Sequence, residues 1–222
     1  MAKQPKTAIL LGATGLTGGH LLRLLLEDGR YSQIRLFSRR AIGFEHPKLV
    51  EFIGDLKNLA SFKKDFAGNV VFCCIGTTKA KTPDKDAYRT IDLGIPVAAA
   101  ELCKQNGIDT FVVLSALGAD SKSAIFYNRV KGEMQDAVQR LGLTKTHIMQ
   151  PSLIGGDRTE KRTGEWLGKL VMKGLDRLLV GPLKKYRTIH PQTIAKAMVW
   201  VANHQVEKQI IKSDEIFEIA AR

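Results

Sequence analysis

The sequence predicts an α/β protein built on a doubly wound parallel sheet, with helices on both faces of the sheet. Short runs of β-branched and apolar residues alternate with longer segments whose apolar residues recur at helical spacing. Most of the short runs are continuously apolar, which is typical of strands that are buried on both faces. The 222 residues contain no Pro/Ser-rich linker and no internal repeat, so residues 1–222 are expected to form a single domain.

The expected strands and helices follow one another along the chain. Strands are predicted at residues 7–11, 34–38, 49–53, 70–74, 110–115 and 144–150, with a last one at 216–219. Helices are predicted at residues 16–27, 88–106, 126–141 and 191–203. Gly107 and Gly142 directly follow two of these helices, at positions where glycine commonly ends a helix.

Residues 155–190 depart from the alternation of strands and helices. This segment is basic and interrupted by glycines, and it contains an amphipathic stretch at 165–179. A late excursion in a doubly wound chain lies past the strand ends, so we expect it to form a wall of the substrate site. A surface helical hairpin that serves only to pack is the alternative.

The composition excludes several classes of protein. No stretch approaches the roughly 18 uninterrupted apolar residues of a membrane span. The three cysteines form neither a disulfide framework nor a zinc-binding pattern, so we expect a cytoplasmic protein without a metal site. The 34 Lys and Arg residues against 22 Asp and Glu residues indicate a solvated basic surface or an anionic ligand. They are scattered along the chain, which does not favour a nucleic-acid partner.

A glycine-rich turn follows the first predicted strand and precedes the first predicted helix. Its glycines have the spacing G-x-x-G-x-x-G over residues 12–18. Glycines in such a turn let backbone N–H groups approach a pyrophosphate, and the helix N-terminus adds a partial positive charge. A turn that is merely tight is the alternative. The candidate cofactor-binding residues here are Gly12, Thr14, Gly15, Leu16 and Thr17.

The end of the second predicted strand indicates which nicotinamide cofactor is bound. About 20 residues past the last glycine, an NAD-binding protein would carry an acidic residue for the ribose 2′-hydroxyl. This chain carries Arg39 and Arg40, whose guanidinium groups suit a 2′-phosphate. The sequence therefore predicts NADP(H) as the cofactor, unless the two arginines only face solvent.

A serine, a tyrosine and a lysine have the spacing of a proton-transfer site. Ser115 ends the fifth predicted strand, at the sheet edge where open α/β folds bind ligands. Tyr127 and Lys131 share one face of the following helix. A nearby ammonium lowers the pKa of a phenol, which makes the tyrosine a better acid or base. We therefore expect these three residues to be catalytic; Tyr127 as a core aromatic is the alternative.

These motifs together resemble the short-chain dehydrogenase/reductase superfamily. More narrowly, the chain is similar to the atypical NAD(P)H-binding oxidoreductases related to the Tat-interacting protein, with a Rossmann-type fold. The similar stretches cover nearly the whole chain, and they are residues 11–18 (L-G-A-T-G-L-T-G), 54–56, 74–78, 114–115, 127–133 (Y-N-R-V-K-G-E) and 157–167 (D-R-T-E-K-R-T-G-E-W-L).

The resemblance implies further contacts with the cofactor. It places Asp55 and Leu56 at the adenine and Gly76 close to the adenosine ribose. It also places Pro151 and Leu153 at the nicotinamide carboxamide, and Lys131 at the nicotinamide ribose.

Three positions carry no assigned role. Gln150 stands where many members of the superfamily have Arg before the proline, so no role of that Arg can be transferred. Asp92 corresponds only loosely to the catalytic Asn of classical members. His190 precedes a predicted helix near the expected cleft, but a single histidine is more often structural.

The sequence thus predicts an NADPH-dependent carbonyl reductase or alcohol dehydrogenase that acts on a small carbonyl or alcohol substrate. The protein is expected to be a monomer or a homodimer. A regulatory protein that senses NADPH and has little or no catalytic activity is the alternative, although it would not need a proton-relay tyrosine.

Overall fold

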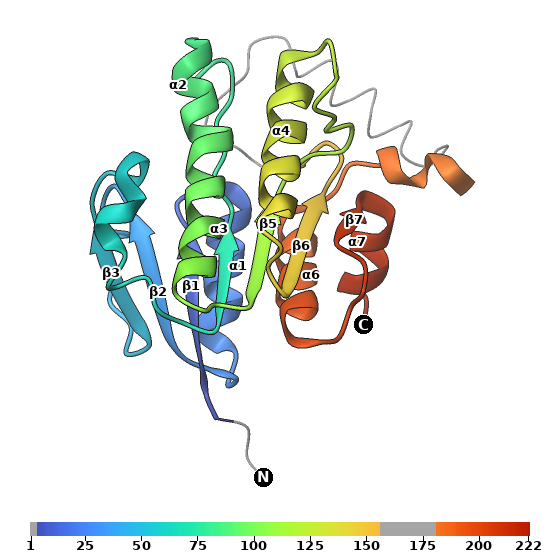
Figure 1. Ribbon diagram of the computed structural model, residues 1–222. Coiled ribbons are helices and arrows are strands. Elements are labelled where there is room, and N and C mark those ends of the chain that lie inside the picture. Colours follow the sequence, from blue (N-terminus) through green and yellow to red (C-terminus); the bar gives the residue numbers. More distant parts are fainter. Residues whose placement is uncertain (1–3, 156–180) are drawn as a thin grey trace.

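A computed structural model describes residues 4–155 and 181–222, and in this part of the chain seven parallel strands form one sheet (Figure 1). The strand order is β3-β2-β1-β4-β5-β6-β7, so the order reverses between β1 and β4, where doubly wound sheets bind ligands. This confirms the predicted fold class. The strands are β1 (Lys6–Leu11), β2 (Tyr31–Ser38), β3 (Leu49–Ile53), β4 (Val70–Cys73), β5 (Thr110–Leu114), β6 (Lys145–Gln150) and β7 (Ile210–Lys212).

Helices cover both faces of the sheet. One face carries α1 (Leu16–Glu27), α6 (Pro191–Asn203) and α7 (Ser213–Ala220). The other face carries α3 (Ile95–Gln105), α4 (Phe126–Arg140) and the 3₁₀ helix η1 (Leu56–Phe62). The shorter helices are α2 (Lys85–Arg89), the π-helix η2 (Thr90–Gly94) and the 3₁₀ helix η3 (Gly181–Tyr186).

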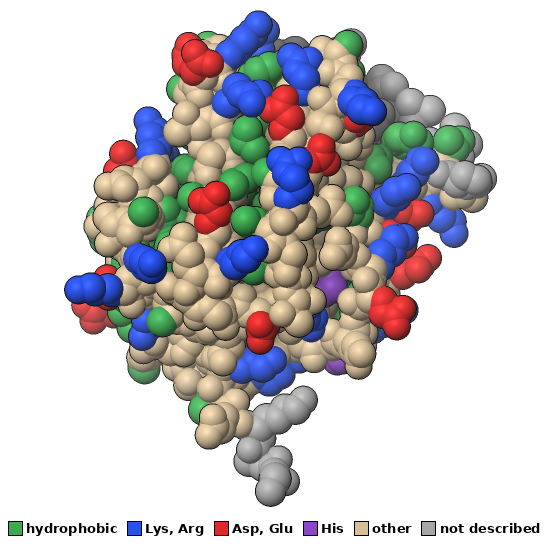
Figure 2. All heavy atoms as spheres, in the orientation of Figure 1, with side chains coloured by type: hydrophobic (Ala, Val, Ile, Leu, Met, Phe, Trp, Pro, Cys, Tyr) green, Lys and Arg blue, Asp and Glu red, His purple; other side chains and the backbone are tan. Residues whose placement is uncertain are grey.

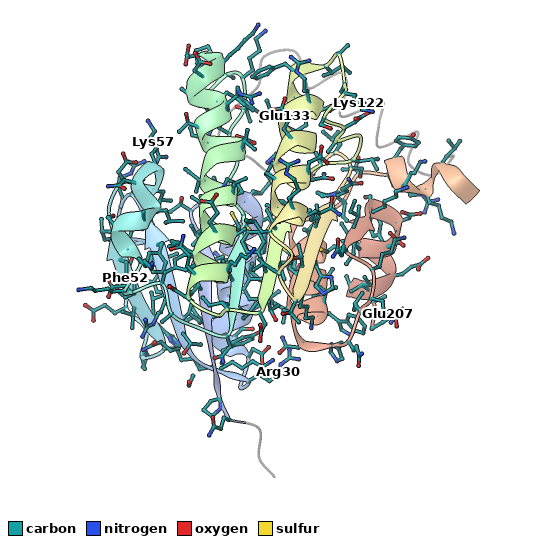
Figure 3. The ribbon with its side chains drawn as sticks, viewed as in Figure 1. Arg30, Phe52, Lys57, Lys122, Glu133 and Glu207 are labelled. Atoms are coloured by element: carbon teal, nitrogen blue, oxygen red, sulfur yellow. The ribbon has the colours of Figure 1, made fainter. Side chains whose placement is uncertain are left out.

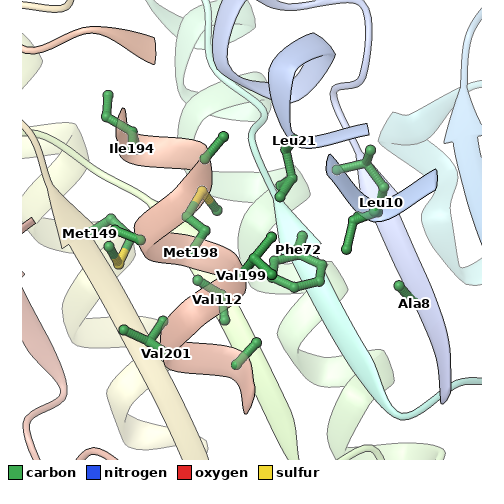
Figure 4. Packing of buried hydrophobic residues seen from close by; sticks show 14 of the residues in the cluster. Ala8, Leu10, Leu21, Phe72, Val112, Met149, Ile194, Met198, Val199 and Val201 are labelled. Carbon is green, nitrogen blue, oxygen red and sulfur yellow. The ribbon is translucent and has the colours of Figure 1, made fainter. Parts of the chain in front are cut away.

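The core consists of two apolar layers, one on each side of the sheet. On β1, Ala8 and Leu10 pack into the layer beneath α6, whereas Ile9 and Leu11 pack into the layer beneath α3 and α4. Figure 4 shows the first layer, in which Met198 of α6 lies among side chains of the strands. Successive strand residues point to opposite faces, so burial of both faces requires the continuously apolar runs seen in the sequence.

The prediction of a last strand at 216–219 is wrong. These residues lie inside α7, and the seventh strand comes before them, at Ile210–Lys212. The Glu215 carboxylate accepts a hydrogen bond from the Lys212 backbone N–H at 2.8 Å, which starts the helix. Ile216 and Ile219 are buried at helical spacing, so tertiary packing outweighs their β-propensity.

The helix predicted at 88–106 starts earlier and is not regular throughout. It begins at Lys85, where the Asp84 carboxylate accepts the Ala87 N–H at 2.8 Å, and it changes to a π-helix over Thr90–Gly94. Such π segments frequently occur at functional sites. This one carries Asp92, which has no exposed surface. Gly107 and Gly142 have φ of +67° and +64°, as expected for glycines that end helices.

The predicted excursion at 155–190 is described only at its two ends. The amphipathic stretch 165–179 lies outside the described residues. The ends are joined beside the carboxyl end of β6: the Gly155 N–H donates to the Ile189 carbonyl at 2.9 Å, and the Ile189 N–H donates to the Leu153 carbonyl at 3.0 Å. Within residues 4–155 and 181–222, no helix is long and apolar enough to cross a membrane.

Candidate functional site

The glycine-rich turn is packed too closely for side chains. Gly12 has φ of +89°, and a Cβ atom there would lie 2.8 Å from the carbonyl of Cys74 at the end of β4. A Cβ atom on Gly18 would lie 2.1 Å from the Gly12 carbonyl oxygen. The glycines therefore bring the start of α1 against the ends of β1 and β4, at the switch point of the sheet.

The first turn of α1 has the features of an anion site. Gly15 is its N-cap and has no side chain to bond the first helical N–H groups, and the turn contains no acidic residue. Thr14 and Gly15 are exposed, whereas Thr17 is buried and Leu16 is partly buried. An open helix N-terminus beside a bare glycine turn fits a pyrophosphate.

Replacing Gly18 by alanine should destabilise the fold by about 1–3 kcal/mol, because the new methyl group forces α1 away from the turn. The same shift should weaken cofactor binding. Gly29→Ala is the matched control, since a Cβ atom there has no neighbour within 4 Å. Urea unfolding and cofactor titration of both variants test this. Equal stability of the two variants would contradict the close approach.

The residues predicted at the adenosine lie at the ends of β2 and β3. Arg39 and Arg40 are both exposed directly after β2. Asp55 is also exposed, and it caps η1 by accepting the Lys57 N–H at 3.0 Å. Leu56 is only 5% exposed and its side chain packs in the core, so only its backbone could contact an adenine. The structure thus brings Arg39, Arg40 and Asp55 to one edge of the sheet.

Lys131 forms a buried ion pair with Asp92. Its ammonium lies 2.9 Å from Asp92 Oδ1, and both side chains are almost fully buried. Asp92 Oδ2 accepts the Thr77 N–H at 2.7 Å. A Cβ atom on Gly76 would lie 3.3 Å from Asp92 Oδ1 and 3.6 Å from Lys131 Nζ, so the pair lies beneath the turn that follows β4.

The ion pair keeps Lys131 charged. Burial by itself lowers the pKa of Lys131, but the negative charge of Asp92, with a smaller contribution from Tyr127, outweighs it, and the net pKa is raised. The sequence placed Asp92 only loosely and did not pair it with Lys131. The one feature of the sequence that pointed to a special role of Asp92 was its place as an acidic residue inside an otherwise apolar helical segment, I-D-L-G-I.

The other two candidate catalytic residues differ in exposure. The side chain of Tyr127, at the start of α4, is 41% exposed, so it is not a core aromatic. It precedes Lys131 by one helical turn and acts electrostatically on it. Ser115 follows β5 and is buried, and its backbone N–H donates to the Met149 carbonyl at 2.8 Å.

Two buried glutamines extend from Ser115. The Gln135 Nε2 group donates to Ser115 Oγ at 2.5 Å, and the Gln150 Nε2 group donates to Gln135 Oε1 at 3.0 Å. Sequence reasoning noticed Gln150 only as a departure from Arg, and it missed Gln135. The spacing of four residues between Lys131 and Gln135 was the available signal.

The residues predicted at the nicotinamide follow β6. Pro151 is buried, and its carbonyl accepts the Leu117 N–H at 2.8 Å. Leu153 is 48% exposed and available for contact. His190 is exposed directly before α6, and its side chain does not cap that helix.

Basic side chains do not gather into one groove on the face that carries α3 and α4. Figure 2 shows Lys and Arg spread over this face and mixed with Asp and Glu. This distribution agrees with the scatter of basic residues along the sequence and favours no nucleic-acid surface here.

Comparison with known proteins identifies the family. A sequence model of a family described as NAD(P)H-binding matches residues 12–205. This chain belongs to that family. Its relatives include "Protein HTATIP2" of Rattus norvegicus, 35% identical over 170 residues that cover 75% of this chain and 70% of the relative. Another is "Protein fmp52, mitochondrial" of Aspergillus clavatus, 32% identical over 165 residues that cover 70% of each chain.

A solved structure supports the fold of this NAD(P)H-binding protein. MoeE5 in complex with UDP-glucose and NAD superimposes with a TM-score of 0.65 at 15% identity, covering 97% of this chain and 81% of MoeE5. The family and the fold together confirm the resemblance to short-chain dehydrogenase/reductase-like proteins and a nicotinamide cofactor. The Aspergillus relative is named as a mitochondrial protein, so the cytoplasmic location of this chain stays a prediction.

Proposed function

We propose that this protein is an NADPH-dependent oxidoreductase that interconverts a small carbonyl compound and its alcohol. The observation that supports this most strongly is the placement of Lys131. Its ammonium is buried and charged, lies 2.9 Å from Asp92 beneath the turn at Gly76, and is one helical turn from the exposed phenol of Tyr127. A pure cofactor sensor would not need a charged lysine one helical turn from an exposed phenol.

Each residue then has a defined task. The turn at Gly12–Gly18 and the N-terminus of α1 would bind the pyrophosphate, and Lys131 would bind the nicotinamide ribose. Bound NADPH would supply the hydride. Tyr127 would donate its phenolic proton to the substrate oxygen, and the positive charge of Lys131 would stabilise the phenolate that remains. Ser115 would donate a hydrogen bond to the same oxygen.

The activity can be tested by the loss of NADPH absorbance in the presence of aldehydes, ketones and quinones. Residues 155–190 are proposed to complete the substrate side, because their described ends join beside the exposed Leu153. Turnover of at least one carbonyl class supports the reductase proposal. NADPH binding without any turnover across the panel would favour the sensor instead.

The cofactor preference gives a second test. If Arg39 and Arg40 hold the 2′-phosphate, NADPH should bind roughly ten- to hundredfold more tightly than NADH, the scale of a charge-assisted contact. The double variant Arg39→Ala with Arg40→Ala should lose this preference and keep its affinity for NADH. Arg23→Ala, an exposed arginine on α1, is the matched control. Equal dissociation constants of the two cofactors for the wild-type protein would refute the assignment.

A further inference from the structure

We propose that Gln135 is a positioning residue that holds the Ser115 hydroxyl as a hydrogen-bond donor to the substrate oxygen. The proposal rests on the proposed reductase function and adds a residue to its site. It comes from the direction of the hydrogen bonds in the buried chain Gln150–Gln135–Ser115.

The direction is set by what each group can do. The amide nitrogen of Gln135 can donate but not accept, so at 2.5 Å from Ser115 Oγ it occupies an acceptor position of the hydroxyl. The proton of Ser115 must then point elsewhere. Among the residues that the structure describes, Gln135 is the only side-chain partner of this hydroxyl, and none of them takes its proton.

Gln150 bonds Gln135 in a matching orientation. Its Nε2 group donates to Gln135 Oε1 at 3.0 Å, and a flipped Gln135 would place two donors against each other there and an acceptor against Ser115. All three side chains are buried, and leaving a buried donor unpaired is costly. In the direction that the structure shows, the two amides leave the Ser115 proton without an acceptor among the described residues, and a substrate oxygen would supply one.

This arrangement suits a carbonyl oxygen, which only accepts. Tyr127, Lys131 and Gln135 are spaced by four residues on α4, so one side of this helix carries the acid, its charged neighbour and the group that orients Ser115. The substrate oxygen would receive hydrogen bonds from both Ser115 and Tyr127. Donors aimed at an oxygen that gains negative charge stabilise the transition state.

Gln135→Glu tests the direction without changing the shape of the side chain. An ionised carboxylate would accept the Ser115 proton, so the hydroxyl could no longer donate to the substrate. We expect kcat/KM near neutral pH to fall on the order of tenfold. Activity should recover as the pH falls and the introduced carboxylate becomes protonated, because the carboxylic acid can donate to Ser115 again. A purely structural role of Gln135 predicts no such acid-dependent recovery.

Gln139→Glu is the matched control. It lies one turn further along α4 and donates to Gln209 Oε1 at 3.1 Å, away from Ser115. It should keep the wild-type pH profile and turnover. A wild-type pH profile for Gln135→Glu as well would overturn the inference.

A second measurement uses no turnover and does not require Gln135→Glu to fold. The side-chain NH₂ resonances of Gln135 should shift in Ser115→Ala, which removes their acceptor, and should stay in place in Tyr127→Phe. Unchanged Gln135 resonances in Ser115→Ala would overturn the inference. If no carbonyl is turned over but these resonances shift, the reductase proposal fails and the contact between Gln135 and Ser115 is upheld.

Discussion

Replacing Tyr127 by phenylalanine should lower the turnover of the best carbonyl substrate by about 10²-fold or more, the usual scale of general acid catalysis. The change removes only the phenolic oxygen from a side chain that is 41% exposed, so the fold should be unaffected. NADPH affinity should barely change, since the phenol acts on the substrate oxygen. Steady-state kinetics and fluorescence titration of the cofactor measure the two effects separately.

Tyr31→Phe is the control for this experiment. The Tyr31 hydroxyl accepts a hydrogen bond from Asn203 at 2.7 Å at the start of β2, far along the strands from their carboxyl ends. Its loss should cost about 1 kcal/mol of stability and no activity. A Tyr127→Phe protein as fast as the wild type would remove Tyr127 as the acid, and the sensor hypothesis would then be preferred.

Replacing Asp92 by alanine should destabilise the fold by about 3–5 kcal/mol, because it leaves the charge of Lys131 buried and unpaired. The pKa of Lys131 is raised in the folded state, so the stabilisation by this pair is present below the unfolded value of 10.5 and is lost as the pH rises above it. Urea unfolding at pH 7 therefore measures its full contribution.

Glu133→Ala is the matched control for Asp92→Ala. Glu133, labelled on α4 in Figure 3, lies 2.6 Å from Arg89 in a pair that solvent reaches, and its removal should cost at most about 1 kcal/mol. A third variant, Asp92→Leu with Lys131→Met, removes both buried charges. It should recover most of the stability and remain inactive. If Asp92→Ala costs no more than Glu133→Ala, the buried pair does not stabilise the fold as argued.

The doubly wound fold could be predicted because its signals are local. A strand buried on both faces must be continuously apolar, and a helix on one face of a sheet must be apolar at every third or fourth residue. The turn at Gly12–Gly18 is largely local, since Gly15 and Gly18 meet backbone of the same turn, whereas Gly12 meets Cys74 after β4. The sequence does not predict the short β7, and it predicts a strand inside α7, because isoleucines suit a strand and a buried helix alike.

The candidate site was predictable only in part. The spacing of Tyr127 and Lys131 on one helix, and the position of Ser115 at a strand end, follow from the sequence. The partners of these residues do not, because they come from other elements: Asp92 from a π-helix that local propensity does not predict, and Gln150 from the end of β6. Hydrogen bonds and ion pairs between distant segments depend on how helices pack on the sheet. The tertiary structure alone therefore decided that Lys131 pairs with Asp92 and that Ser115 contacts Gln135, since most buried polar groups find a partner and the partners here come from distant segments.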